Sequence, residues 1–303
     1  MPNERNKKLD YLSYVLARVL AALVMLVPVR MLYAIARSLG DFLYLVDRRH
    51  RNLAIEQISK SFPDWPQEKV RAVARESLRS IVKLGIETVI TPRMITLTSW
   101  RRRIQLKNIA PILAMQLEQP HGMILVTGHY GNWEVGGFTL ARLGMPVVAI
   151  ARPLDNPYLD RWLRGIREQA GLRIVDKGGA SGPSQEVLLG GGWVCFVADQ
   201  DAGRRGVFVD FFSRPASTFR TIALLALSYQ VPIIVGAARR LADNFTFEVA
   251  ASRTILPTDW AGKDDEVQWI TQEFTRALET IVRDNPGQYF GWAHRRWKHA
   301  PKE

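Results

Sequence analysis

Hydrophobic and polar residues follow one pattern up to about residue 118 and a different pattern after it. In the first part, apolar residues recur every three or four positions over 52–60 and 66–90, with a break at the sequence FPDWP. Residues 9–46 are mostly apolar. Recurrence at this spacing is typical of amphipathic helices. The pattern therefore predicts that the first third of the chain is wholly helical.

From Gly122 onward, short apolar runs alternate with amphipathic stretches. The expected strands are the runs MILVT, PVVAI, LRIV, WVCFVA, VPIIVGA and FTFEVA. The expected helices cover 135–143, 158–169, 185–189, 217–229 and 265–282, the fourth capped by Ser217 or Thr218. Such alternation is typical of an α/β fold, in which helices flank a largely parallel central sheet. We predict an N-terminal helical segment over 1–46 and a single main domain over 47–303, helical to about 118.

Three arginines interrupt the apolar N-terminal segment, namely Arg18, Arg30 and Arg37. The longest uncharged run, Val19 to Val29, is shorter than the ~20 residues that a membrane-spanning helix needs. Arginine side chains can reach lipid head groups from an apolar helix, and Pro28 would kink such a helix. The segment is therefore predicted to be a membrane anchor that dips into one leaflet or spans the bilayer incompletely. The alternative is a buried first helix packed on the domain.

Composition narrows the range of partners. Of the 303 residues, 47% are apolar, and 41 Lys and Arg against 29 Asp and Glu give a formal net charge of +12. A basic surplus favours acidic partners such as nucleic acid, anionic lipid, phosphorylated substrates or an acidic carrier protein. Nucleic acid is not expected, because no RNP-like or zinc-knuckle pattern accompanies the 9 tryptophans. Cys195, the only cysteine, is expected to be a small core residue.

The sequence ILVTGHYGNWEVGG places two titratable residues, His129 and Glu134, directly after an apolar run that reads as a buried strand. Five residues apart, they converge only if the chain turns, and Gly131 allows that turn. Asn132 is expected to cap the following helix, whose N-terminal amides would face a developing oxyanion. A carboxylate beside an imidazole makes the histidine a competent general base for a hydroxyl. The alternative is a polar loop in which both side chains only form hydrogen bonds.

Five motifs in order carry a resemblance to a known family: HYGNWE, ARPLDNPYLDRWLRGIRE, VADQD, GVFVDFFSRPAST and YFGWAHRRWK. Together they resemble the lipid A late acyltransferases, the lauroyl and myristoyl transferases of lipopolysaccharide synthesis. The resemblance covers most of the chain, including the N-terminal anchor. That family belongs to the wider group of membrane acyltransferases with a His-x4-Asp/Glu motif. The EGTR-like element of the glycerol-3-phosphate and lysophosphatidate branch is absent from the sequence.

The resemblance implies transfer of an acyl chain from an acyl carrier protein thioester to a hydroxyl of the lipid A precursor. His129 would take the hydroxyl proton, and Glu134 would hold His129 and balance its new charge. The expected partners are acyl carrier protein, the lipid A precursor and an anionic phospholipid membrane, at the cytoplasmic face of the cell inner membrane. The alternatives are another acceptor, such as a lysophospholipid, an aminoacyl lipid or a glycolipid, and a non-catalytic membrane scaffold.

The resemblance also marks Arg167 in GIRE and Asp199 in ADQD as polar site positions. Arg167 is expected to hold a phosphate or to brace Glu134, and Arg164, one turn earlier, is a rival for that role. Asp199 is expected to order either Arg167 or the loop of the histidine. These three residues, with Asn132, are the predicted substrate-binding set.

Two further predictions concern metals and the C-terminal part. Asp199 and Asp201 lack a third ligand nearby, so no metal is expected, and no cofactor other than the thioester co-substrate. The cluster HRRWK, His294 to Lys298, lies among tryptophans and suits a membrane interface or lipid phosphates, with a plain basic tail as the alternative. The phenylalanines of GVFVDFF are expected either to line an acyl groove or to pack in the core.

Overall fold

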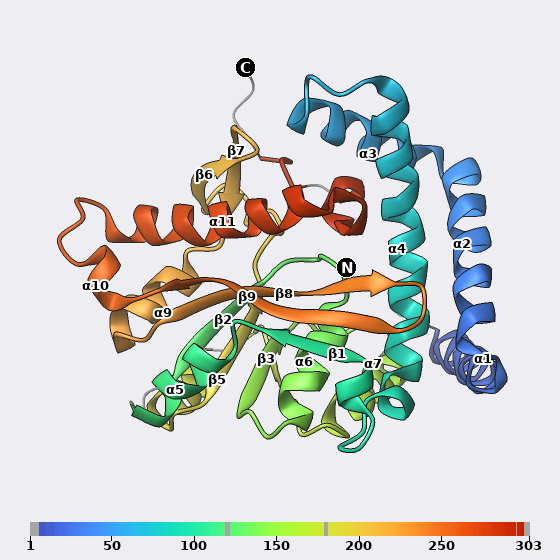
Figure 1. Cartoon of the computed structure of the whole chain (residues 1–303), viewed down its shortest axis with the longest axis horizontal. Helices are drawn as coiled ribbons and strands as arrows, with labels where there is room; N and C mark the ends of the chain where they lie inside the picture. Colours follow the sequence, from blue (N-terminus) through green and yellow to red (C-terminus); the bar gives the residue numbers. More distant parts are fainter. Residues whose placement is uncertain (1–5, 119–121, 179–180, 295, 300–303) are drawn as a thin grey trace.

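The computed structural model describes residues 6–118, 122–178, 181–294 and 296–299. The chain begins with four helices, which are α1 (Lys7–Leu26), α2 (Val29–Val46), α3 (Arg48–Ser61) and α4 (Gln67–Met94). The long helix α4 stands at one end of the molecule, and α2 runs beside it on the outside (Figure 1). The chain breaks between α1 and α2 at Pro28, which confirms the predicted kink, and between α3 and α4 at FPDWP.

The centre of the molecule is a seven-stranded sheet with the order β1-β9-β8-β2-β5-β3-β4. Its strands are β1 (Ile104–Lys107), β2 (Met123–Thr127), β3 (Val147–Ala151), β4 (Arg173–Asp176), β5 (Trp193–Val197), β8 (Ile233–Ala242) and β9 (Thr246–Ile255). All neighbouring strands pair in parallel except β8 and β9, which form an antiparallel pair. The prediction of a largely parallel sheet flanked by helices is confirmed.

Strand β1 corrects the prediction of a wholly helical first third. It lies within the part expected to be helical to about 118, and it pairs in parallel with β9 through the register Ile104↔Phe247. Only its first residue is buried, and it has four residues. So short a segment carries no periodic signal of its own, and its conformation is decided by pairing with β9.

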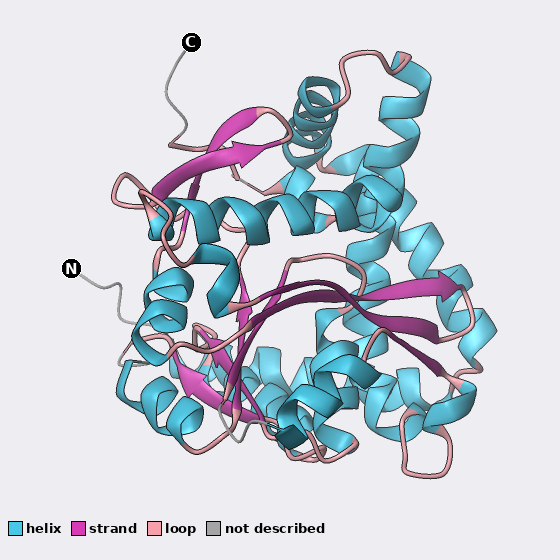
Figure 2. Cartoon of the chain, turned by 60° about the vertical axis from the view of Figure 1, so that its left-hand side comes forward, coloured by secondary structure: helices cyan, strands magenta, loops and turns pink. Residues whose placement is uncertain are grey.

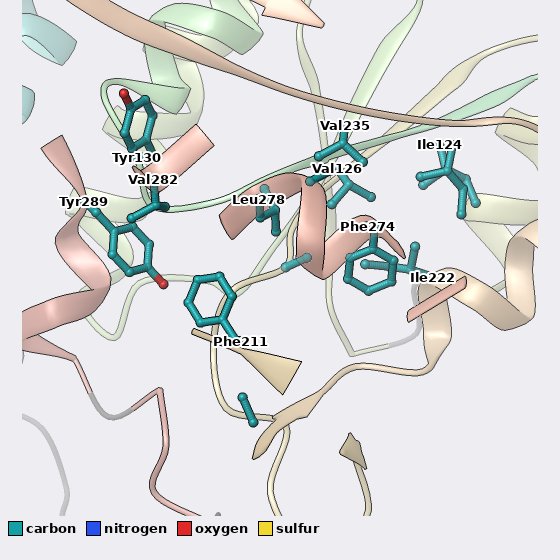
Figure 3. Close-up of a cluster of buried hydrophobic side chains, with 14 of the residues drawn as sticks. Ile124, Val126, Tyr130, Phe211, Ile222, Val235, Phe274, Leu278, Val282 and Tyr289 are labelled. Atoms are coloured by element: carbon teal, nitrogen blue, oxygen red, sulfur yellow. The ribbon is translucent and has the colours of Figure 1, made fainter. Parts of the chain in front are cut away.

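Helices cover both faces of the sheet (Figure 2). They are α5 (Ala110–Glu118), α6 (Trp133–Arg142), α7 (Pro157–Glu168), α8 (Ser181–Leu189), α9 (Thr221–Tyr229), α10 (Pro257–Trp260) and α11 (Glu266–Asp284). Side chains of the central strands alternate between two cores, because successive residues of a strand point to opposite faces. Ile124 and Val126 face the core under α9 and α11, seen in Figure 3, whereas Met123 and Leu125 face the core under α6.

Strands β6 (Val207–Phe211) and β7 (Arg214–Thr218) form a separate antiparallel hairpin. Ser217 and Thr218 lie in β7, so the prediction that one of them caps the next helix is wrong. Helix α9 starts later, and its N-cap residue Arg220 makes no side-chain capping bond. The ladder with β6 extends the chain through 218 and displaces the helix start. Phe211 and Phe212 are buried in the core, which decides their role in favour of packing.

Helix α1 differs from every α-helix that follows it in the described part of the chain, because none of its residues is buried. It has 20 residues with a mean hydropathy of 1.7 over its most apolar window, and among the described residues it is the one helix long and apolar enough to cross a membrane. It is therefore a candidate anchor. The alternative of a buried first helix fails for α1. Helix α2, in contrast, buries one face against α4 through Leu32, Tyr33, Ala36 and Gly40.

Candidate active site

His129 lies in the turn between β2 and α6, just beyond the carboxyl end of a central strand. The turn is made at Gly131, whose φ of +59° is open to glycine. A Cβ atom at this position would lie 2.0 Å from the carbonyl oxygen of Ala238, so the loop packs directly on strand β8. The N–H of Gly131 donates to the carbonyl of Gln288 at 3.0 Å, which fixes the turn from a second side.

Asn132 caps α6 as predicted, because its Oδ1 accepts a hydrogen bond from the N–H of Val135 at 3.0 Å. Its side chain is fully buried, and its Nδ2 donates to Glu87 at 2.8 Å. Both polar atoms are therefore used within the protein. This corrects its assignment to the substrate-binding set: Asn132 shapes the loop from inside.

Asp199 is the carboxylate that contacts the imidazole of His129. Its Oδ1 lies 2.7 Å from Nδ1, and its Oδ2 accepts from the backbone N–H of His129 at 2.8 Å. The sheet explains the pairing, since β2 and β5 are parallel neighbours with the register Thr127↔Val197. Two residues beyond each strand end, the chain places the histidine and the aspartate side by side. With Nδ1 occupied, Nε2 is the ring nitrogen left for chemistry, and the side-chain amide nitrogen of Gln200 lies 3.4 Å from it.

The electrostatics of this pair favour a charged imidazole opposite a charged carboxylate. Burial disfavours the imidazolium, but the Asp199 carboxylate, with a further contribution from Glu134, more than offsets this and raises the pKa of His129. Burial likewise disfavours the Asp199 carboxylate, yet its contacts with His129 hold the pKa of the carboxyl below its usual value. The pair is thus arranged to accept a proton on the histidine.

Glu134 was predicted to hold His129, and the structure corrects that assignment. Its carboxylate is paired with the guanidinium of Arg167 through two bonds, Nε to Oε2 at 2.8 Å and Nη2 to Oε1 at 2.6 Å. The indole of Trp133 donates to the same carboxylate at 3.1 Å. A bidentate pair of this kind fixes both partners. Of the two roles expected for Arg167, bracing Glu134 is the one that the structure shows.

Arg164 is directed elsewhere. Its guanidinium pairs with Asp160 on the same helix at 2.7 Å and with Asp176 at the end of β4. It makes no contact with Glu134 among the interactions of the described residues. Arg167 and not Arg164 therefore braces Glu134, and the expected substrate contacts of both arginines stay predictions.

An apolar pocket lies between α6 and the sheet, with about 640 Å³ of empty space that includes its opening to solvent. Trp133 forms part of its wall, and the same indole packs edge-on against the imidazole of His129, with ring centroids 4.7 Å apart. The residues that leave the space open are small: Gly136, Gly137, Gly236, Ala237, Ala250 and Ala251. Cys195 also lines the pocket, and burial raises the pKa of its thiol to about 12, so it is a neutral lining group.

The C-terminal cluster is divided: His294 and Lys298 are exposed, whereas Arg296 packs inward, which corrects the assignment of this arginine to a membrane interface or basic tail. Arg296 is 2% exposed and donates to the carbonyl of Ser217 at 2.5 Å and to the hydroxyl of Thr218 at 2.7 Å. Trp292 is fully buried. Arg295 lies outside the described residues. Arg296 therefore ties the C-terminal part to strand β7.

No three His, Cys, Asp or Glu side chains are grouped closely enough to hold a metal ion in the part of the chain that the structure describes. The two carboxylates considered as ligands, Asp199 and Asp201, are each bonded to a histidine of their own, His129 and His299. The expectation that no metal or cofactor takes part is not tested by this arrangement and stays a prediction.

Sequence reasoning missed Gln200, Trp133 and Glu87 as residues around the histidine. The first lies in the VADQD motif and the second in HYGNWE, so motif membership was a usable signal for both. Glu87 lies in the middle of α4, in a stretch with ordinary helical spacing. Its contact with the loop arises from the packing of α4 beside the sheet, and a local sequence pattern does not predict such packing.

Comparison with known proteins adds an independent result. The sequence profile of a family described as bacterial lipid A biosynthesis acyltransferase matches residues 3–299. A lipid A biosynthesis acyltransferase of Haemophilus influenzae is 28% identical over 281 residues, covering 89% of this chain and 86% of that protein. A lipid A biosynthesis acyltransferase 2 of Shigella flexneri is 21% identical over 257 residues, covering 83% and 79%. A phosphatidylinositol mannoside acyltransferase of Mycolicibacterium smegmatis is 30% identical over 171 residues, covering 55% and 54%.

Proposed function

The chain belongs to the family of bacterial lipid A biosynthesis acyltransferases, and we propose that it transfers a fatty acyl chain from an acyl carrier protein thioester to a hydroxyl of a lipid A precursor. One observation carries the proposal: His129, paired with Asp199 and with a raised pKa, packs against the indole of Trp133, and that indole also lines an apolar pocket. A base for a hydroxyl and a dry site for an acyl chain are the two things this reaction needs.

In the proposed reaction, Nε2 of His129 takes the proton of the acceptor hydroxyl while the hydroxyl oxygen attacks the thioester carbonyl carbon. The carbon becomes tetrahedral, and its oxygen carries the negative charge. In this proposal that oxygen accepts from amides at the N-terminus of α6 and from the side-chain amide of Gln200, whose nitrogen lies 3.4 Å from Nε2. Collapse breaks the carbon–sulfur bond, the thiolate takes the proton from His129, and an ester and the free carrier thiol result.

The roles of the two carboxylates differ in this proposal. Asp199 accepts from Nδ1 and stabilises the imidazolium as it forms, so it is the orienting group of the base. Glu134 acts at longer range, since its charge favours the imidazolium while Arg167 holds its carboxylate in place. This division of roles between the two carboxylates gives the glutamate of the motif a task although it does not contact the histidine.

Membrane association is part of the proposal. Helix α1 has no buried residue, and the outer face of α2 exposes apolar side chains at helical spacing, Met31, Ile35, Leu39 and Phe42. The two helices lie together at the outer end of the molecule (Figure 1). We place this surface against the cytoplasmic face of the inner membrane, where acyl carrier protein is present and where the +12 net charge would attract both anionic lipid and the acidic carrier.

A second candidate acceptor is a mannosylated glycolipid. The observation that favours it is the similarity to the phosphatidylinositol mannoside acyltransferase of M. smegmatis, which spans about half of each chain. The chemistry at His129 would be the same, because that acceptor also offers a hydroxyl.

The test is acyl transfer in detergent from a panel of acyl carrier protein thioesters to a lipid A precursor and to a mannosylated phosphatidylinositol. We expect ester from the wild type with the lipid A precursor, and a loss of at least ~100-fold in His129→Ala. His50→Ala, at an exposed histidine paired with Asp47, is the matched control and should retain activity. Product with the mannosylated phosphatidylinositol alone would show that this lipid, and not the lipid A precursor, is the acceptor. Equal activity of wild type and His129→Ala would overturn the mechanism.

A further inference from the structure

Glu87, in the middle of α4, is a buried carboxylate that the proposed mechanism does not use. Its side chain is 1% exposed. Donors from three other segments converge on it: the hydroxyl of Tyr33 on α2 at 2.6 Å, Nδ2 of Asn132 at 2.8 Å, and the guanidinium of Arg240 on β8 at 2.5 Å and 2.7 Å. A carboxylate removed from water in this way needs such partners to remain charged.

The main chain of Arg240 is also linked to the active-site loop, through Gln288. Its backbone N–H donates to Oε1 of Gln288 at 2.9 Å, and its carbonyl accepts from Nε2 of that residue at 2.8 Å. The carbonyl of Gln288 in turn accepts from the N–H of Gly131 at 3.0 Å. Burial opposes the charge on Arg240, but Glu87 outweighs it and raises the pKa of the guanidinium, so Arg240 stays charged. Asn132 is therefore bonded to the buried ion pair itself, whereas Gly131 is linked through Gln288 to the main chain of Arg240.

The contact with Asn132 has a specific geometric effect. A side-chain amide can cap α6 only when its oxygen faces the N–H of Val135. Glu87 accepts only from the nitrogen of that amide, so it fixes which way the amide points. The cap defines where α6 begins, and the start of α6 sets how the loop closes to bring His129 onto Asp199.

We propose that the side chains of Glu87 and Arg240 are positioning groups of the active site, which hold the His129 loop through Asn132. The proposal rests on the proposed function, because it assigns a task to the loop that carries the base. The network of contacts also reaches α2, because the hydroxyl of Tyr33 donates to the same Glu87 carboxylate.

A merely structural ion pair would stabilise the fold without affecting the base. Helix α4 supplies a matched example in Lys83, which is 5% exposed and pairs with Glu76 at 2.8 Å and with Asp243 at 3.0 Å. Its ion pairs within the described part of the chain do not reach the His129 loop. Lys83→Met therefore removes a buried charge from the same helix and serves as the control.

Two variants of the full chain separate the roles. Asn132→Ser keeps a good N-cap oxygen and removes the contact with Glu87. Glu87→Met with Arg240→Met removes both charges together, which a core tolerates better than the loss of one. We expect kcat to fall at least ~10-fold in each, with less than the summed effect when they are combined, because both act through one contact. Lys83→Met should lower Tm and leave kcat within about twofold.

A second measurement does not need substrate. The pKa of His129 is followed by NMR titration, its signal assigned by comparison with His129→Gln. The groups that face the imidazole are Asp199 and Glu134. A loosened loop weakens the contact with Asp199, so the pKa should fall towards 6.5 in both positioning variants and stay raised in Lys83→Met. If Asn132→Ser keeps the wild-type kcat and His129 pKa, the proposal is overturned. A shifted pKa in a protein with no transferase activity would support the positioning role and reject the proposed function instead.

Discussion

The imidazole of His129 is held by Asp199, which lies 70 residues further along the chain, and not by the glutamate of its own motif. The contact is made twice, by the ring Nδ1 at 2.7 Å and by the backbone N–H at 2.8 Å. Because the side chain and the main chain of the histidine share one buried carboxylate, the ring orientation and the loop conformation depend on each other.

Asp199→Asn should inactivate the enzyme without unfolding it. An asparagine keeps the volume but loses the charge that selects the tautomer with a free Nε2 and stabilises the imidazolium, so we expect kcat to fall at least ~100-fold. The measurement is the steady-state rate of ester formation with a saturating donor. Asp201→Asn is the matched control, because Asp201 lies two residues away and pairs with His299. Comparable losses in both variants would mean that Asp199 acts only through local structure.

Arg167→Lys should reduce kcat by a smaller factor, about tenfold, because a lysine cannot form the two parallel bonds that hold Glu134. The charge of Glu134 would remain but its position would not. Arg164→Lys tests the neighbouring arginine, which pairs with Asp160 and Asp176, and it should leave kcat unchanged. If Arg164→Lys is the more damaging variant, the roles of the two arginines have been exchanged.

Physical reasons explain which elements and contacts could be predicted from the sequence and which could not. The sheet strands from Met123 onward and most of the longer helices follow from the alternation of apolar runs and amphipathic stretches, whereas strand β7 and the four-residue helix α10 do not. The capping role of Asn132 followed from local chemistry. Which carboxylate reaches His129 depends instead on β5 lying next to β2, a fact of strand order that spacing within one motif does not contain. The inward packing of Arg296 was missed for the same reason, since a basic residue near a terminus looks solvated until its buried partners are known.

The rate should depend on pH through His129. The base must be neutral, and its pKa is raised above the usual 6.5, so kcat should increase with pH to a midpoint above that value. In Asp199→Asn the midpoint should move to lower pH, because the partner that raises the pKa is gone. The pair has the opposite consequence for stability. The raised histidine pKa contributes stability that is present below about 6.5 and is lost as pH rises through the folded-state pKa. A pH–rate profile with the same midpoint in both proteins would assign the titration to another group.

The pocket offers the most direct test of how donor length is selected. Cys195 lies on β5 and lines the space between α6 and the sheet, so Cys195→Phe would place a ring in the volume that the acyl chain is proposed to occupy. Each methylene that no longer fits forfeits ~0.8 kcal/mol of burial, so the loss of a few methylenes should change donor preference by more than tenfold. We expect kcat/KM to fall for the longest donors accepted by the wild type and to be retained for shorter ones.

The control for this prediction is Cys195→Ala, which enlarges the pocket slightly and removes the thiol. It should keep or lengthen the donor preference, because the thiol, with a pKa raised to about 12, is neutral and supplies no chemistry. The two variants therefore separate the effect of pocket volume from any effect of the thiol's reactivity. A uniform loss across all donors in Cys195→Phe, with normal folding, would place the acyl chain elsewhere, whereas a loss confined to long donors would show that the space under α6 measures the chain.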